Sequence, residues 1–170
     1  MKILRAHDYR FVEAVKNEIA ILPKRWSECI ASVPWILLPD DMSPIWTGLM
    51  TEESVSHDGR KYSEIGGWYC PTVADKNWRD APHIYLKPKS LTHAAVHEAA
   101  HALEEAMRAP ASELFEPERA LYPYMASNKS EFFACAVDAF LRHQNDKRWN
   151  IDDLEKSGAK IYDYLKAQLL

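Results

Sequence analysis

The segment from Ala94 to Leu103, AAVHEAAHAL, constrains the fold of this chain more than any other. Its alanines give it a high intrinsic helix propensity, and its apolar residues occupy nearly every side of such a helix. A helix that is apolar on all sides has to be buried, so this segment predicts a central core helix. Ser90 and Thr92 are the candidate N-caps, and Pro110 marks the end of the helical pattern.

The same segment carries the pattern H-E-x-x-H at His97, Glu98 and His101. Residues i and i+4 of an α-helix lie one turn apart on one face, so both imidazoles can reach a single ion. Glu98 lies beside them and can reach a water on that ion. The alternative is a surface helix with solvated histidines, but the apolar surroundings favour burial, and buried polar groups need partners. We interpret His93, one turn earlier, as a capping or supporting residue and not as a ligand.

A catalytic zinc site needs a third protein ligand and an open position. The extended metzincin pattern requires a glycine at position 104 and a histidine at position 107, and the chain has Glu104 and Met107, so that class is excluded. Glu131 stands out because it opens an apolar helix, although an acid in a first turn is also favoured by the helix dipole. The downstream candidates are Glu113, Glu116, Glu118, Glu131, Asp138 and His143.

The stretch HEAAHALEE, followed by YPYMASNKSEFFACAVDAF, resembles the catalytic-domain family of anthrax lethal factor and the Pro-Pro endopeptidases. These are zinc metallopeptidases of the gluzincin type. In that family a tyrosine follows the H-E-x-x-H helix, and a glutamate seven residues later opens the next helix. Tyr124 and Glu131 have this spacing. GGWYC and PHIYLKP also look like the family's paired strands, so the resemblance covers roughly Gly66 to Phe140.

The resemblance implies that His97, His101 and Glu131 bind one Zn²⁺ ion, that Glu98 is the general base, and that Tyr124 donates to the oxyanion. It further implies a zinc-dependent endopeptidase that hydrolyses peptide bonds with a zinc-activated water, acting on a protein or peptide substrate. Such a substrate is expected to add as a strand along an exposed sheet edge. The GGWYCPT strand is the candidate edge, with Trp68 and Tyr69 either as subsite walls or as ordinary core aromatics.

One position departs from the family pattern. The family commonly has an acid one turn after the ligand glutamate, where it orients a ligand histidine, and this chain has Cys135 there. Asp138 is a candidate substitute. The departure keeps open an alternative function, a zinc-bound but catalytically weak or inactive protein-binding domain. A zinc hydrolase for another bond and a metal-free structural role for the histidines are further alternatives.

The remaining segments predict an α+β fold in one zincin-like domain over residues 1–170, with a small central β-sheet. We expect the first helix to run from an Asp8 cap to Ile21 and to stop before Pro23. The other expected elements are a helix at 24–31, strands within VPWILLPDD, EIGGWYCPT and APHIYLKP, a polar connection at 73–80, a short helix between Pro117 and Pro123, a helix capped by Ser127 or Asn128, and a last helix at 151–170.

Composition limits the classes of binding partner and the cellular locations that we expect. The net charge of −4 with neutral histidines argues against a nucleic-acid binder, and no apolar run is long enough for a membrane span. Three scattered cysteines form no C-x-x-C pair, so no zinc ribbon or disulfide framework is predicted. The first residues lack the apolar core of a signal peptide. This predicts a cytoplasmic protein, and leaves open export by a dedicated secretion system, as for an effector or toxin. The pattern indicates no oligomeric state.

Overall fold

The structure, a computed structural model, describes residues 1–6, 8–40, 59–61, 64–70, 82–88, 91–142 and 149–169. Its strands are β1 (Lys2–Ala6), β2 (Pro34–Leu37), β3 (Gly67–Cys70) and β4 (His83–Leu86). Its helices are α1 (Tyr9–Ile19), α2 (Lys24–Cys29), α3 (Leu91–Ala106), α4 (Ala111–Leu114), the 3-10 turn η3 (Pro117–Arg119), α5 (Lys129–Phe140), α6 (Ile151–Ser157) and α7 (Lys160–Ala167). The expected connection at 73–80 lies outside the described residues.

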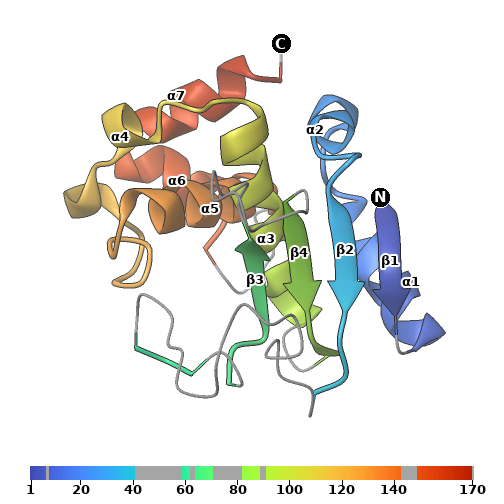
Figure 1. Cartoon of the computed structure of the whole chain (residues 1–170). Helices are drawn as coiled ribbons and strands as arrows, with labels where there is room; N and C mark the ends of the chain where they lie inside the picture. Colours follow the sequence, from blue (N-terminus) through green and yellow to red (C-terminus); the bar gives the residue numbers. More distant parts are fainter. Residues whose placement is uncertain are drawn as a thin grey trace, which may run out of the picture.

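The four strands form one mixed sheet in the order β1-β2-β4-β3 (Figure 1). β1, β2 and β4 are parallel, and β3 pairs antiparallel with β4 through Gly67↔Leu86 and Tyr69↔Ile84. β3 is therefore an edge strand of the described sheet. This mixed α/β composition, with a small sheet, agrees with the predicted α+β class.

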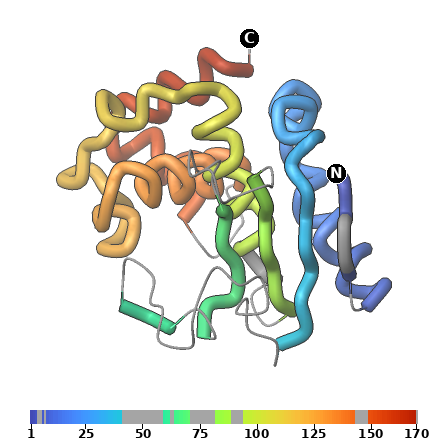
Figure 2. Tube along the Cα trace, in the orientation of Figure 1, coloured from blue at the N-terminus to red at the C-terminus, as the bar shows by residue number. Residues whose placement is uncertain are grey.

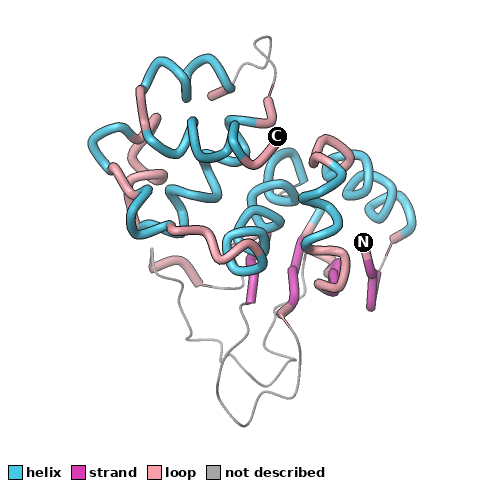
Figure 3. The backbone as a smooth tube through the Cα atoms, turned by 90° about the horizontal axis from the view of Figure 1, so that it is seen from above, coloured by secondary structure: helices cyan, strands magenta, loops and turns pink. Residues whose placement is uncertain are grey.

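The described helices gather on one side of the sheet, as the view from above shows (Figure 3). The alternation of side chains explains why. Trp35, Leu37, Ile84 and Leu86 face the helices and join a core cluster that extends from Phe11 to Leu165. The opposite sheet face carries a smaller cluster of Ile36, Leu38, Cys70 and Tyr85, against which Trp68 packs.

α3 is the central core helix that the sequence predicts. Ala95, Val96, Ala99 and Ala100 are fully buried, and α3 contacts α1, α5, β3 and β4. The tube view shows α5 crossing beside α3, although 22 residues, 107–128, separate the end of α3 from the start of α5 (Figure 2). Alanine side chains on both helices let their backbones approach closely.

Several local predictions are confirmed. Asp8 caps α1 by accepting a hydrogen bond from the Arg10 backbone N–H, and Asn128 caps α5. The strand predicted within APHIYLKP is β4, and its side chains alternate, with Ile84 and Leu86 on one face and Tyr85 on the other. The Pro-rich region holds two short helical turns, α4 and η3. Both N-terminal helices end two residues earlier than predicted, at Ile19 and Cys29.

The structure differs from expectation at both ends of the described chain. β1 was not expected, because its charged residues obscure the apolar alternation that usually marks a strand. The last helix is not continuous. It breaks into α6 and α7 at Gly158, which adopts a left-handed conformation with φ 65° and ends α6. Glycine tolerates this conformation at a helix C-terminus, and Arg119 donates to the Ser157 carbonyl beside it.

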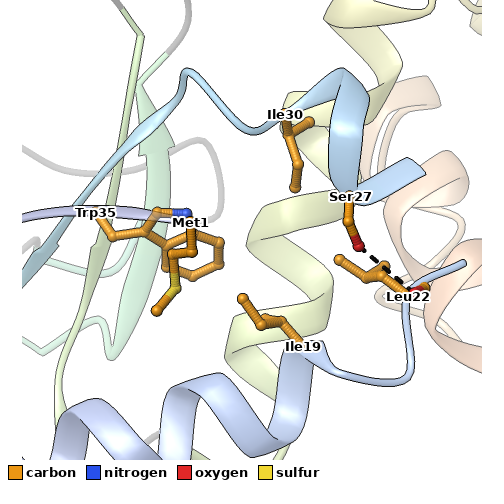
Figure 4. Close-up of a pocket in the computed structure, with 6 residues that line it drawn as sticks. All are labelled: Met1, Ile19, Leu22, Ser27, Ile30 and Trp35. Carbon is orange, nitrogen blue, oxygen red and sulfur yellow. Dashed lines mark hydrogen bonds between the residues drawn. The ribbon is translucent and has the colours of Figure 1, made fainter. Parts of the chain in front are cut away.

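A small cavity of about 30 Å³ lies where β2 approaches α1 and α2 (Figure 4). Its lining comprises Met1, Ile19, Leu22, Ser27, Ile30 and Trp35. In this lining, Ser27 Oγ lies 3.5 Å from the Leu22 carbonyl. The cavity includes no residue of α3 or α5. In the described part of the chain, every helix is too short or too polar to cross a membrane.

Candidate metal centre

The first half of the centre comes from α3. His97 and His101 lie one turn apart on the face that meets α5, and their rings are nearly perpendicular, with centroids 4.8 Å apart. This arrangement brings the two Nε2 atoms to 3.2 Å from each other. The side chain of His93 lies outside the described part of the structure, so the interpretation of His93 stays a prediction.

The second half comes from the first turn of α5. The Asn128 side chain accepts hydrogen bonds from the backbone N–H groups of Ser130 and Glu131, at 3.0 and 2.9 Å. This cap fixes the turn, and the apolar residues that follow draw it into the core. Glu131 is thereby held in a buried position opposite the two histidines, with only 7% of its surface exposed.

Three donor atoms converge between the helices. The Glu131 Oε2 atom lies 3.0 Å from His97 Nε2 and 3.6 Å from His101 Nε2. The two histidine side chains are still 17% and 12% exposed, so the centre lies near the protein surface, whereas the Glu131 Oε2 atom is buried. Two imidazole nitrogens and one carboxylate oxygen at these separations can bind one divalent cation.

The charges in the cluster favour a cation. Burial alone would lower the pKa of His97, but hydrogen bonds to Cys135 and Glu131 raise it well above its ordinary value. Burial alone would raise the pKa of Glu131, but hydrogen bonds from His101 and His97 hold it far below its usual range. The cluster therefore stabilises positive charge. A metal ion can take the place of the proton that the histidines donate to Glu131.

Glu98 lies next to the donors on the β3 side of α3. Burial is the main reason that the pKa of Glu98 is raised. The charges of His97 and His101 oppose this, and the Tyr69 backbone N–H opposes it further by donating to the carboxylate. The space for this contact exists because residue 67 is glycine. A Cβ at Gly67 would lie 3.2 Å from Glu98 Cγ and 2.7 Å from Leu86 Cδ2.

The backbone groups of β3 that do not pair with β4 lie on the side of Glu98. The Lys87 N–H donates to the Gly66 carbonyl, which sets the hydrogen-bonded pairs of the ladder at 66–87 and 68–85. In this register the N–H and C=O groups of Gly67 and Tyr69 point away from β4. The Tyr69 N–H contact with Glu98 agrees with that direction.

The predicted subsite aromatics differ from each other. Trp68 stacks on Tyr85, with ring centroids 4.4 Å apart, on the sheet face opposite α3. It therefore packs as a core aromatic. Tyr69 turns toward α3, and its hydroxyl donates to Glu105 Oε2 at 2.6 Å.

Tyr124 also lies at the centre. Its ring centroid is 6.2 Å from that of His97, and the Arg60 guanidinium carbon lies 6.0 Å from the centre of the Tyr124 ring. Burial, followed by the charge and hydrogen bond of Glu131, raises the pKa of the Tyr124 hydroxyl. The hydroxyl is thus protonated and adjacent to the donor atoms.

Cys135 offers a second, overlapping ligand set. His97, Glu131 and Cys135 each present a ligand atom within 4.8 Å of the others, so this buried group could also hold a metal ion. However, Cys135 Sγ lies 4.0 Å from His97 Nδ1, whereas Nε2 of the same ring faces His101 and Glu131. One ring cannot direct both nitrogens to one ion. We therefore favour His97, His101 and Glu131 as the ligand set. Cys135 then contacts the Nδ1 atom of His97, which faces away from the other two ligands.

The other candidate ligands do not join the three converging donors in the described structure. Asp138 pairs with Arg142 through contacts of 2.7 and 3.2 Å. The group that faces the Nδ1 atom of His97 is therefore the thiol of Cys135 and not the Asp138 carboxylate. Glu116 binds Lys160. Glu113 and Glu118 are exposed, and His143 lies outside the described residues.

Sequence reasoning missed two polar residues beside His101. Ser130 Oγ lies 3.0 Å from His101 Nδ1 and donates to Glu104 Oε2 at 2.6 Å. The i, i+3 spacing of His101 and Glu104 was available as a signal, but the position of Ser130 between them depends on how α5 packs on α3. No family model and no curated protein matches the chain.

Proposed function

We propose that this chain is a zinc-dependent endopeptidase with a zincin-like arrangement of edge strand, H-E-x-x-H helix and ligand helix. The observation that carries the proposal is the convergence of His97 Nε2, His101 Nε2 and Glu131 Oε2 beside a buried Glu98. In a tetrahedral zinc site with ligand distances of about 2.0–2.1 Å, donor atoms lie about 3.3 Å apart. The three separations here, 3.0, 3.2 and 3.6 Å, bracket that value.

His97, His101 and Glu131 would hold the zinc ion. When bound, zinc supplies a Lewis acid that polarises a carbonyl and lowers the pKa of a coordinated water. Glu98 is in position to accept a proton and return it to a leaving amine, and its raised pKa suits a group that does both. The Tyr124 hydroxyl, now bonded to Glu131, can turn its proton toward a developing oxyanion.

The edge of β3 that faces away from β4, unpaired by any other strand of the described sheet, is the proposed substrate platform. An extended peptide can pair with the outward N–H and C=O groups of Gly67 and with the C=O group of Tyr69, whose N–H donates to Glu98, and so pass Glu98 as an added strand. Such pairing recognises the backbone N–H and C=O groups of the substrate, which every protein or peptide carries. The net charge of −4 gives no electrostatic attraction for nucleic acid.

A library of diverse peptides tests this function. Zinc-loaded wild type and Glu98→Gln are incubated with the library, and the products are read by mass spectrometry. We expect cuts by the wild type only, with the same zinc content in both proteins. Cleavage by Glu98→Gln at the wild-type rate would overturn the mechanism. A zinc-loaded wild type that makes no cuts would instead favour the protein-binding alternative, which the thiol behind His97 makes chemically reasonable.

A further inference from the structure

Each histidine of the proposed site has one ring nitrogen, Nδ1, that faces away from the convergence point of the donor atoms. A metal-binding imidazole is oriented by the hydrogen bond that its other nitrogen makes, and that partner is usually a carboxylate or a carbonyl oxygen. Behind His97 the partner is the thiol of Cys135, at 4.0 Å. A thiol is a weak hydrogen-bonding group, so it orients the ring poorly.

Behind His101 the partner is stronger. Ser130 Oγ lies 3.0 Å from His101 Nδ1, and the same oxygen donates to Glu104 Oε2 at 2.6 Å. An ionised carboxylate only accepts hydrogen bonds, so the single hydroxyl proton of Ser130 has to point at Glu104. The lone pairs of Oγ then face His101, and Nδ1 has to be the protonated nitrogen.

The proton on Nδ1 decides what Nε2 can do. A neutral imidazole with its proton on Nδ1 has a lone pair on Nε2, and Nε2 is the atom that faces Glu131 and His97. The chain from Glu104 through Ser130 thus selects the tautomer that can bind a metal. The short contact to the carboxylate also polarises the hydroxyl and strengthens its bond to the ring.

The two helices make this chain rigid. His101 and Glu104 are three residues apart on α3, and Ser130 enters between them from α5. The Ser130 backbone N–H is bound to the Asn128 cap, so the hydroxyl is held by the same turn that carries Glu131. The proposed ligand Glu131 and the residue that orients His101, Ser130, are therefore held by the same turn.

We propose that Ser130 and Glu104 are positioning residues that orient His101 for metal binding, with the Glu104 carboxylate acting through the Ser130 hydroxyl. This inference rests on the proposed metal site. It concerns the chain's own hydrogen bonds, so zinc affinity and histidine tautomers test it independently of catalysis.

Zinc affinity is measured by chelator competition for wild type, Ser130→Ala, Ser130→Thr, Glu104→Ala and the Ser130→Ala/Glu104→Ala double variant. We expect each single alanine variant to bind zinc about 10–100-fold more weakly. The threonine keeps the hydroxyl and should restore nearly wild-type affinity. The double variant should bind zinc no more weakly than the weaker-binding single variant, because each single substitution already breaks the same hydrogen-bond chain. Ser112→Ala is the control, since Ser112 is exposed and accepts from Lys129, the neighbour of Ser130.

Nitrogen-15 NMR of the zinc-free protein gives a second readout. The wild type should show the His101 proton on Nδ1, and this signal should exchange faster with solvent in Ser130→Ala. Wild-type zinc affinity in both single alanine variants would overturn the inference while leaving the proposed function intact. A wild type that binds no zinc at all would overturn the metal site and the inference together.

Discussion

At the scale of single residues, the centre depends on small side chains that make room for charged ones. Glu98 reaches the Tyr69 N–H because Gly67 adds no Cβ between α3 and β3. The H-E-x-x-H pattern identified the acid and the two histidines from sequence. The need for glycine at 67 could not be predicted, because it arises from the packing of β3 on α3 and leaves no local pattern.

Gly67→Ala should disturb Glu98, the proposed general base, without touching a proposed metal ligand. The new methyl group would lie 2.7 Å from Leu86 Cδ2, so the Leu86 side chain has to move, and 3.2 Å from Glu98 Cγ, so Glu98 has to shift by a few tenths of an ångström. We expect a loss of about 1–3 kcal/mol in the free energy of unfolding, as for other overpacked sites. Peptide cleavage should fall while zinc content stays at the wild-type level. Urea unfolding and cleavage assays check this, and full activity would show that the contact does not position Glu98.

Tyr124→Phe removes one hydroxyl and keeps the ring beside His97. If that hydroxyl donates to the oxyanion, kcat should fall about 10²–10³-fold, the usual effect of losing one such donor. Zinc affinity should change little, because the phenol is not one of the three converging donors. Steady-state kinetics and zinc content measure the two effects separately. A large loss of zinc with unchanged kcat per bound ion would assign Tyr124 to metal binding.

At the scale of elements, the position of α5 sets the site, because its first turn carries both Ser130 and Glu131. The sequence predicted this helix and offered Asn128 as one of two caps, since Asn before an apolar helical run is a common N-cap. The sequence did not predict the break between α6 and α7, although Gly158 was a visible signal for it. The resemblance, and not the helical pattern, singled out Glu131 among the acids.

Asn128→Ala should loosen that turn. Losing the cap bonds to the Ser130 and Glu131 N–H groups should cost about 1 kcal/mol of stability and lower Tm by about 2–4 °C. Zinc affinity should also fall, because the capped turn carries Glu131. Asn128→Asp keeps a cap oxygen and is the matched control. If Asn128→Ala loses stability but binds zinc like wild type, the cap does not hold the ligand in place.

The start of α7 is tied to the loop before η3 by Glu116. Its carboxylate accepts from the Lys160 backbone N–H at 2.7 Å and pairs with the Lys160 ammonium at 3.3 Å. These contacts, the backbone bond first, lower the pKa of Glu116 below 4.5. A lowered pKa stabilises the fold above pH 4.5, and this stabilisation is lost as the pH falls through the folded-state value.

Glu116→Gln should therefore lower Tm at pH 7 by a small amount, and the difference from wild type should shrink below pH 4.5. Thermal unfolding from pH 3 to pH 7 measures it, with the exposed Glu113→Gln as control. A difference that is the same at every pH would show that the charge of Glu116 contributes nothing.

At the scale of the whole molecule, the candidate centre joins two halves of the chain. α3 packs on the sheet and α1, and α5 packs on α4, α6 and α7. An ion held by His97, His101 and Glu131 would link these halves. The sequence predicted the class of fold and the burial of α3, because helical burial follows from composition. It did not predict how α5 approaches α3, since this depends on contacts between distant segments.

Removal of zinc should then destabilise the whole domain. A ligand at about 1,000 times its Kd stabilises the folded state by about 4 kcal/mol, so zinc should raise Tm by several degrees and a chelator should reverse the effect. His101→Ala, which lacks one proposed ligand, should show a much smaller zinc-dependent shift. An equal shift in wild type and His101→Ala would place the stabilising ion at another site.

X-ray absorption at the zinc edge of the zinc-loaded protein tests the central claim most directly, because it distinguishes the two overlapping ligand sets. With His97, His101 and Glu131 as ligands, the first shell should contain only nitrogen and oxygen, at about 2.0–2.1 Å, with one zinc per chain. A sulfur atom at about 2.3 Å would show that Cys135 binds the ion, and a protein that retains no zinc would contradict the account as a whole.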